Sequence, residues 1–148
     1  MLDPNDPLRI RMEIEQLLHD YWYEVDTNWG RDAHEYFTDD GVFRNSVGRA
    51  RVGRAEISDF YNGRQARGSR VVRHVVSNLR VQPVVGDQVH SNWILQIFAA
   101  DGEAPLPSEP AILLAEVTDV CRRGADGTWR YASRTIEGLF KGATPTTT

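Results

Sequence analysis

Two segments that lie far apart in the sequence carry side chains suited to proton transfer. Residues 21–26 read Tyr-Trp-Tyr-Glu-Val-Asp within a stretch of helical periodicity, and residues 73–78 read Arg-His-Val-Val-Ser-Asn within a β-rich run. A phenol, a carboxylate and an imidazole therefore occur in segments that should otherwise form the core. Burying an ionisable group costs free energy unless the group is paired or put to use. We predict a small-molecule cavity with acid–base groups in its wall.

Asp26 and His74 are the leading candidates for catalysis. Asp26 lies at the edge of the apolar stripe of its helix, where a carboxylate can act as a general base or acid. His is the side chain best suited to moving protons near neutral pH. A neutral His74 hydrogen-bonded to Asp26 would form a dyad in which the carboxylate orients the ring. The alternatives are a solvent-facing Asp26, or one bound to Arg31, and a purely structural His74.

Tyr21 and four further residues complete the predicted site. Tyr21 lies five residues before Asp26, and its phenol could donate a hydrogen bond to a developing oxyanion, unless it is simply a core residue. The other side chains are predicted to bind substrate, mainly by lining an apolar pocket. They are Trp22, Phe43, Asn78 and Trp93.

The first half of the chain is predicted to be mainly helical. Apolar residues recur at steps of three and four near the N-terminus, which is typical of an amphipathic helix. The predicted elements are a long helix over 8–28, a short helix over 31–37, a turn over 38–41, short strands over 41–46 and 50–52, and a helix over 54–66.

The second half is predicted to form β-structure. Four runs rich in Val, Ile, Trp and Tyr, over 71–84, 88–99, 111–122 and 128–140, are separated by turn and loop signals. On the two strands of the last hairpin, Asp119 and Arg134 could face each other as a structural ion pair. The predicted fold class is α+β, a strongly curved mixed, mainly antiparallel sheet wrapped around the long N-terminal helix. Residues 1–140 are expected to form one domain and 141–148 a disordered tail.

Composition excludes several classes of protein. The chain has 148 residues, a formal net charge of −4 and one cysteine, Cys121, so neither an intrachain disulfide nor a cysteine-based zinc site is expected. The histidines have no metal-ligand spacing, and glycine fingerprints for phosphate or dinucleotide cofactors are absent. We expect no metal, no cofactor, no nucleic-acid partner and no membrane span, and a cytoplasmic location.

One segment is locally basic. Residues 44–73 contain eight arginines against only Glu56 and Asp59. Solvated surface and salt bridges explain such a segment most simply. The alternative is a funnel for an anionic substrate, because a cleft of one sign attracts the opposite charge.

The order of the motifs resembles the SnoaL-like branch of the nuclear-transport-factor-like cone fold, over roughly residues 8–140. The matching pieces are Ile-Glu-Gln-Leu-Leu at 14–18, Asp26 followed by Trp29, Phe-Thr-Asp-Asp-Gly-Val at 37–42, Gly-Arg-Ala-Glu-Ile at 53–57, the segment at 73–78, and Asp-Gly-Thr-Trp-Arg at 126–130 leading to Ser-Arg-Thr at 133–135.

Within that branch the chain is similar to two groups. In scytalone and bile-acid dehydratases a Tyr and an Asp on the first helix and a His on the third strand transfer protons, and Tyr21, Asp26 and His74 stand at the matching places. The bile-acid enzymes also have an acid shortly after a Trp, whereas Trp93 is followed here by Ile-Leu-Gln-Ile-Phe. The second group is the β subunit of aromatic-ring-hydroxylating dioxygenases, which is largely structural.

The resemblance and the residues together predict a cofactor-independent enzyme of the dehydratase or isomerase type. Its substrate would be small, apolar and cyclic, with Asp26, His74 and Tyr21 as the catalytic residues. The alternative is a non-catalytic ligand-binding module or a structural β subunit of a dioxygenase. Apolar residues expected on the outer sheet face, Val75, Leu79 and Leu95 or Ile94, predict a homodimer.

Overall fold

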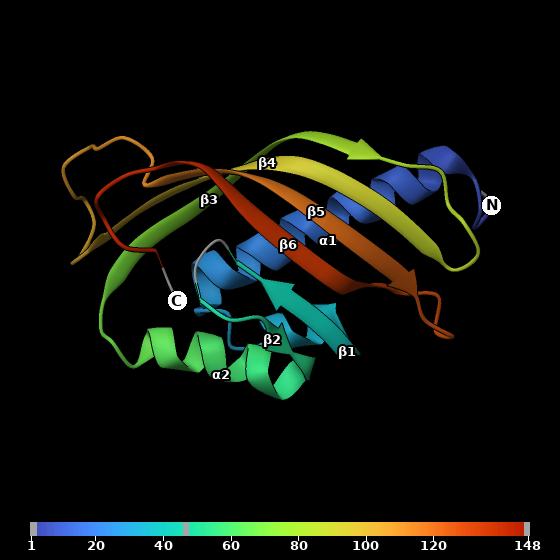
Figure 1. Ribbon diagram of the computed structural model, residues 1–148, viewed down its shortest axis with the longest axis horizontal. Helices are drawn as coiled ribbons and strands as arrows, with labels where there is room; N and C mark the ends of the chain where they lie inside the picture. The colour runs from blue at the N-terminus through green and yellow to red at the C-terminus, as the bar shows by residue number, and fades with distance from the viewer. Residues whose placement is uncertain (1–2, 46–47, 147–148) are drawn as a thin grey trace.

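The computed structural model describes residues 3–45 and 48–146, which form two helices, a short 3₁₀ helix and six strands (Figure 1). In chain order the elements are α1 (Pro7–Asn28), η1 (Ala33–Tyr36), β1 (Phe37–Arg44), β2 (Arg51–Val52), α2 (Gly53–Gln65), β3 (Arg70–Val81), β4 (Gln88–Asp101), β5 (Leu113–Arg123) and β6 (Trp129–Lys141).

Local signals at both ends define α1. The Asp6 side chain accepts hydrogen bonds from the backbone N–H groups of Leu8 and Arg9, and Pro7 occupies the first turn, where a missing N–H costs nothing. The helix ends where Trp29 takes a left-handed conformation. The residues that face the core follow the predicted stripe; they are Ile10, Ile14, Leu17, Leu18, Tyr21, Trp22 and Val25.

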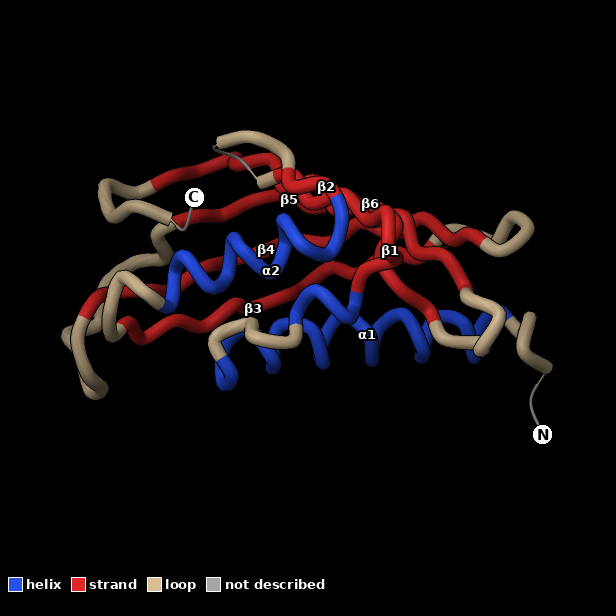
Figure 2. The backbone as a smooth tube through the Cα atoms, turned by 90° about the horizontal axis from the view of Figure 1, so that it is seen from below, coloured by secondary structure: helices blue, strands red, loops and turns tan. Residues whose placement is uncertain are grey.

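The six strands form one curved sheet in the order β2-β1-β6-β5-β4-β3. Every neighbouring pair is antiparallel except β1 and β6, which run parallel. Buried residues alternate along β4 and β5, and both helices lie on the side of the sheet to which these residues point (Figure 2). The predicted fold class is therefore confirmed. No helix within residues 3–45 and 48–146 is long and apolar enough to cross a membrane.

The predicted turn over residues 38–41 was wrong, because these residues lie inside β1. The pairing register with β6 shifts between Phe37 and Val42, so the Asp-Asp-Gly run forms an irregularity within the strand. The side chains of Asp39 and Asp40 point to solvent and pair with Arg54 and Arg122. These residues therefore bulge between two points at which β1 pairs with β6, Phe37 with Tyr131 and Val42 with Ser133. The short helix predicted over residues 31–37 is the 3₁₀ helix η1. Ser46, which was predicted to lie in a strand, is outside the described residues.

A bulge in β3 changes which residues face the core. Asn78 has a φ of 58°, and the register with β4 shifts between Ser77 and Arg80. As a result Asn78 is exposed, whereas Leu79 packs against the core instead of lying on the outer face. Leu95, also considered for the outer face, is fully buried, and Val75 is exposed as predicted.

The C-terminal segment continues past β6. The N–H of Gly142 donates to the carbonyl of Ile112, and Arg70 Nη2 donates to the carbonyl of Pro145 at 3.0 Å. Lys141 is the last residue of β6. Disorder over 141–148 remains a prediction, and residues 147–148 lie outside the described part of the chain.

The ion pair predicted between Asp119 and Arg134 is confirmed and is completely buried. Arg134 Nε and Nη2 donate to the two carboxylate oxygens of Asp119 at 2.8 and 3.0 Å, and Trp93 Nε1 donates to the same carboxylate at 2.7 Å. The guanidinium carbon lies 4.0 Å from the ring centre of Tyr131 and 4.6 Å from that of Tyr21. Burial by itself would lower the pKa of Arg134, but the charge of Asp119 raises it well above its usual range.

Candidate active site

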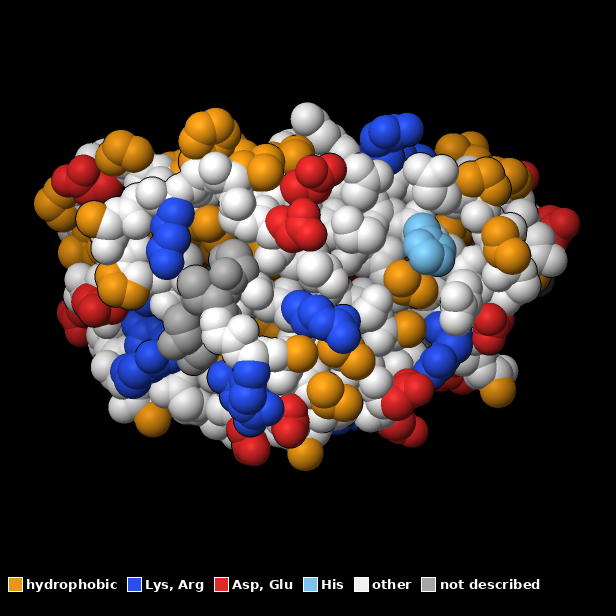
Figure 3. Space-filling model, viewed as in Figure 1, with side chains coloured by type: hydrophobic (Ala, Val, Ile, Leu, Met, Phe, Trp, Pro, Cys, Tyr) orange, Lys and Arg blue, Asp and Glu red, His pale blue; other side chains and the backbone are white. Residues whose placement is uncertain are grey.

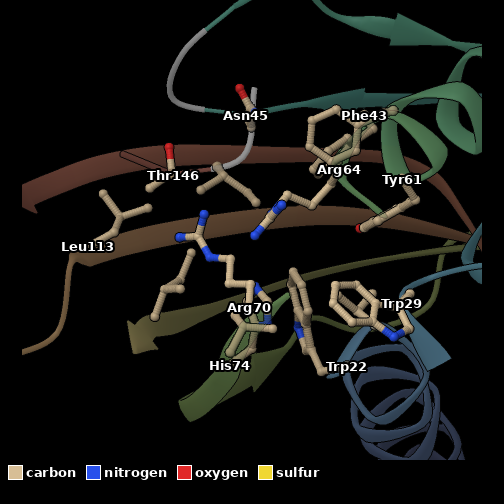
Figure 4. Close-up of a pocket in the computed structure, with 15 residues that line it drawn as sticks. Trp22, Trp29, Phe43, Asn45, Tyr61, Arg64, Arg70, His74, Leu113 and Thr146 are labelled. Atoms are coloured by element: carbon tan, nitrogen blue, oxygen red, sulfur yellow. The ribbon is translucent and has the colours of Figure 1, made fainter. Parts of the chain in front are cut away.

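A mostly apolar cavity of about 90 Å³ opens between the C-terminal end of α1, helix α2 and the sheet (Figure 4). Its apolar lining consists of Trp22, Val25, Trp29, Phe43, Phe60, Val72, Ile97, Leu113 and Ile136. Its polar lining consists of Asn45, Tyr61, Arg64, Arg70, His74 and Thr146. An apolar pocket with a few convergent polar groups is typical of a small-molecule site.

Asp26 and His74 meet at the wall of this cavity. Asp26 Oδ1 lies 2.6 Å from His74 Nδ1, and Asp26 Oδ2 accepts the backbone N–H of His74 at 2.9 Å. Only 8% of the Asp26 side chain and 10% of the His74 side chain are exposed. Both carboxylate oxygens are thus engaged by one residue. Since Asp26 occupies Nδ1, Nε2 is the His74 nitrogen left for a ligand.

Trp22 holds the imidazole from one face. Its indole ring stacks on His74 with the ring centres 4.0 Å apart and the planes 16° from parallel. Trp22 comes from α1, one turn before Asp26, so a single helix supplies both groups that orient the ring. In the part of the chain that the structure describes, Trp22 Nε1 is buried and has no hydrogen-bond partner. It is a donor at the cavity wall that a ligand oxygen could satisfy.

Tyr61 on α2 brings a phenol to the cavity, and Tyr21 supports it from behind. The two hydroxyl groups are hydrogen-bonded to each other, but only Tyr61 lines the cavity. Burial raises the pKa of Tyr61 well above its usual value, and burial also raises that of Tyr21. Both phenols are therefore neutral near pH 7, and a neutral phenol can donate a hydrogen bond.

Gly30 allows Tyr61 to occupy this position. Gly30 has a φ of 68°, and a Cβ built on it would lie 2.5 Å from Tyr61 Cδ1. We expect Gly30→Ala to lower the free energy of unfolding by about 1–3 kcal/mol through backbone strain, and further because the Tyr61 ring must move. Gly86→Ala is the matched control, since Gly86 has a φ of 64° and nothing within 4 Å of its Cβ position. Urea denaturation of both variants separates the cost of displacing the Tyr61 ring from the cost of backbone strain. Equal losses of stability in the two variants would contradict close packing of Gly30 against Tyr61.

The predicted site residues fall into three groups. His74, Trp22 and Phe43 line the cavity, and Asp26 lies directly behind His74. Tyr21 and Trp93 are buried in the core beside the cavity without lining it. Asn78 is exposed on the bulge of β3 and lines a separate pocket, because the bulge turns it away from the face that carries His74.

Sequence reasoning missed Tyr61, Arg64 and Arg70 as cavity residues. The apolar side of the helix that carries Tyr61 was visible in the sequence, and so was the basic character of residues 44–73. Several arginines of that basic segment form ion pairs or hydrogen bonds outside the cavity. Arg49 pairs with Glu56, and Arg54 pairs with Asp39. On the face shown in Figure 3, acidic and basic side chains are interspersed. Only Arg64 and Arg70 among these eight arginines line the cavity.

The described residues contain no cluster of three or more His, Cys, Asp or Glu side chains that could bind a metal ion. The chemistry that this site can offer from its own side chains is proton transfer by His74 and hydrogen bonding by Tyr61 and Trp22.

The fold is shared with solved structures. A protein from Catenulispora acidiphila, solved in complex with S-DNPA, is 25% identical, with a TM-score of 0.77 over 88% of this chain and 94% of that one. A protein from Novosphingobium aromaticivorans, provisionally assigned as a scytalone dehydratase, is 20% identical, with a TM-score of 0.81 over 99% and 93%. An NTF2-like protein with a cystatin-like fold from the same organism is 22% identical, with a TM-score of 0.74 over 92% and 86%.

These similarities define the class of the protein as an α+β domain with the NTF2-like cone fold. A family model of the SnoaL-like domain matches residues 6–135, and the chain belongs to this family. A search of curated proteins found no significant match. The resemblance inferred from the sequence motifs is therefore confirmed at the level of family and fold.

Proposed function

We propose that this protein is a cofactor-independent enzyme that takes a proton from the carbon next to a carbonyl group in a small, apolar, cyclic substrate, leading to elimination of water or to isomerisation. The observation that carries the proposal is the contact of 2.6 Å between Asp26 Oδ1 and His74 Nδ1 at the wall of an apolar cavity. A carboxylate that accepts the Nδ1 proton leaves Nε2 as a base and stabilises the imidazolium that forms.

The reaction proceeds through an enolate. His74 Nε2 takes a proton from the carbon next to the carbonyl, and the electron pair of that C–H bond moves onto the carbonyl oxygen. Tyr61 Oη and Trp22 Nε1 donate hydrogen bonds to this oxygen as its charge develops. In a dehydration, the imidazolium then protonates a hydroxyl on the next carbon; water leaves as the enolate electrons form the carbon–carbon double bond. In an isomerisation, the same proton goes to a different carbon.

Tyr21 acts through Tyr61 in this scheme. The sequence suggested that Tyr21 itself polarises the substrate oxygen, but Tyr61 is the phenol that lines the cavity. Tyr21 fixes the position of the Tyr61 hydroxyl by their mutual hydrogen bond. Aromatic contacts with Trp22, Tyr36 and Phe37 hold the Tyr21 ring.

The relatives support the same class of ligand. One structure was solved with a bound small molecule, S-DNPA, and another belongs to a protein provisionally assigned as a dehydratase. The cavity of this chain is built mainly from aromatic and aliphatic side chains, which suits a ring system.

Hydrogen–deuterium exchange on 1-indanone tests the proposal without knowledge of the natural substrate. The ketone is incubated with the protein in deuterated buffer, and loss of its α-proton signal is followed by NMR. We expect saturable acceleration over buffer by about 10²–10⁴-fold, the usual contribution of a positioned acid–base group. Binding of the ketone without accelerated exchange would favour a non-catalytic ligand-binding module. Co-purification with a large iron-dependent subunit would favour the role of a dioxygenase β subunit.

The cytoplasmic location and the homodimer are further proposals. Exposed apolar residues on the sheet and near its end, including Val75, Phe98 and Phe140, support self-association. Light scattering on the eluting protein measures its mass in solution, and a monomer at all concentrations would contradict the homodimer.

A further inference from the structure

Arg64 and Arg70 bring two positive charges into a cavity that is otherwise mostly apolar. Arg64 comes from the last turn of α2 and Arg70 from the first residue of β3. Figure 4 shows their guanidinium groups pointing toward one another between the apolar side chains of the lining. Burial, and then the nearby charge of Arg64, lower the pKa of Arg70, which agrees with this proximity.

The existing partners of the two arginines leave donors unused. Arg64 Nη2 lies 3.2 Å from Asp101 Oδ1, and Arg70 Nη2 donates to the carbonyl of Pro145. Over residues 3–45 and 48–146, the Nε atoms of both arginines are buried and have no hydrogen-bond partner. A buried N–H of a charged group without a partner is costly, so two of them on one cavity indicate a missing acceptor.

The charge balance identifies the kind of acceptor. The two guanidinium groups carry two positive charges, and Asp101, whose side chain is 82% exposed, offsets part of one of them at the rim. One further negative charge would make the set of Arg64, Arg70 and Asp101 neutral overall. Planar guanidinium groups bind carboxylates through paired N–H donors, and the apolar lining disfavours a more highly charged, strongly hydrated anion.

We propose that Arg64 and Arg70 form a carboxylate-binding subsite, so that the substrate is an apolar ring bearing one carboxylate. The inference rests on the proposed function for the role of His74, which lines the same cavity and would face the reacting part of the ring. The carboxylate orients the substrate, and the reaction takes place at the His74 end.

Binding of phenylacetate and its neutral analogue phenylacetamide tests the subsite. Isothermal titration calorimetry on the full chain should show phenylacetate bound about tenfold or more tightly than the amide, because only the carboxylate meets the buried charges. Arg70→Gln and Arg64→Gln should each remove this preference while leaving amide binding nearly unchanged. Arg67→Gln is the matched control, since Arg67 is exposed just after α2 and does not line the cavity.

Two further variants separate the possible outcomes. His74→Asn should keep the preference for the carboxylate, so failure of the catalytic proposal would leave this result intact. Arg70→Lys, which keeps the charge and changes the donor geometry, should bind phenylacetate with intermediate affinity. Equal binding of acid and amide by the wild type, binding of neither, or a preference that survives in both Gln variants would overturn the proposal. Circular dichroism of every variant establishes that it is folded.

Discussion

Replacing His74 by Asn is expected to reduce the accelerated exchange of 1-indanone by about 10²–10⁴-fold, to near the rate in buffer. An Asn side chain places an N–H donor close to the position of Nδ1, so the hydrogen bond to Asp26 can be kept. It has no group at the position of Nε2, the nitrogen left for a ligand by the contact between Nδ1 and Asp26. The variant therefore removes the proposed base with little disturbance of the wall.

Asp26→Asn tests the second member of the pair. An amide in this position can donate to Nδ1, which places the ring proton on Nε2 and removes the base, and it cannot stabilise an imidazolium. We expect a loss comparable to that of His74→Asn, and the double variant should be little worse than either single one, because the two residues act as a unit. Asp26→Ala and His74→Ala should likewise abolish turnover and remain folded.

His90→Asn provides the control for the loss of a histidine. His90 lies on β4 and is exposed. Its replacement should leave exchange unchanged, and the NMR assay should be run on all variants at equal folded concentration. Exchange close to the wild-type rate in both His74→Asn and Asp26→Asn would remove the proposed mechanism. A loss in His90→Asn would show that the assay reports something other than the cavity.

Replacing Asp119 by Ala is expected to lower the free energy of unfolding by about 3–5 kcal/mol, because it leaves the charge of Arg134 buried without its partner. Arg134 and Asp119 have exposed fractions of 0% and 1%. The same substitution also leaves Trp93 Nε1 without its acceptor. A domain of this size has a total stability of about 5–15 kcal/mol, so the loss should be evident in urea denaturation.

The double variant Asp119→Ala/Arg134→Met separates the cost of an unpaired charge from the value of the pair. Because the buried charge is then absent, the double variant should be more stable than Asp119→Ala alone. Asp119→Asn keeps the size of the side chain and serves where Asp119→Ala does not fold. A loss below about 1 kcal/mol in Asp119→Ala would contradict the role of the pair as the polar centre of the core. Asp40→Asn, which affects an exposed pair with Arg122, should change stability little.

The pair also connects the core to the site. Arg134 lies under the rings of Tyr21 and Trp22, and these residues position the Tyr61 hydroxyl and the His74 ring. Asp119→Ala is therefore expected to weaken ligand binding as well as stability, even though Asp119 does not line the cavity.

Repeating patterns in the sequence predicted the elements, and the order of the motifs indicated the family. The spacing of apolar residues along α1 and their alternation along β4 and β5 show which side of each element is buried, because a buried face leaves a local periodicity in the sequence. The turn signals mark where the strands end. The predicted last hairpin anticipated the facing positions of Asp119 and Arg134, and the family resemblance indicated Asp26 and His74, which are in contact.

The irregularities of the strands and the residues that line the cavity were decided only by the tertiary structure. The bulge at Asn78 moves Leu79 and Val81 to the core side of β3, and residues 38–41 bulge between two pairing points of β1 with β6. Periodicity carries no signal for either, because both depend on partners that are remote in the chain. The cavity membership of Tyr61, Arg64 and Arg70 depends on how α2 lies against β1 and how the chain then enters β3. Those relations exist only once the sheet has curved around its helices, since side chains from eight separate segments must then share one enclosed space.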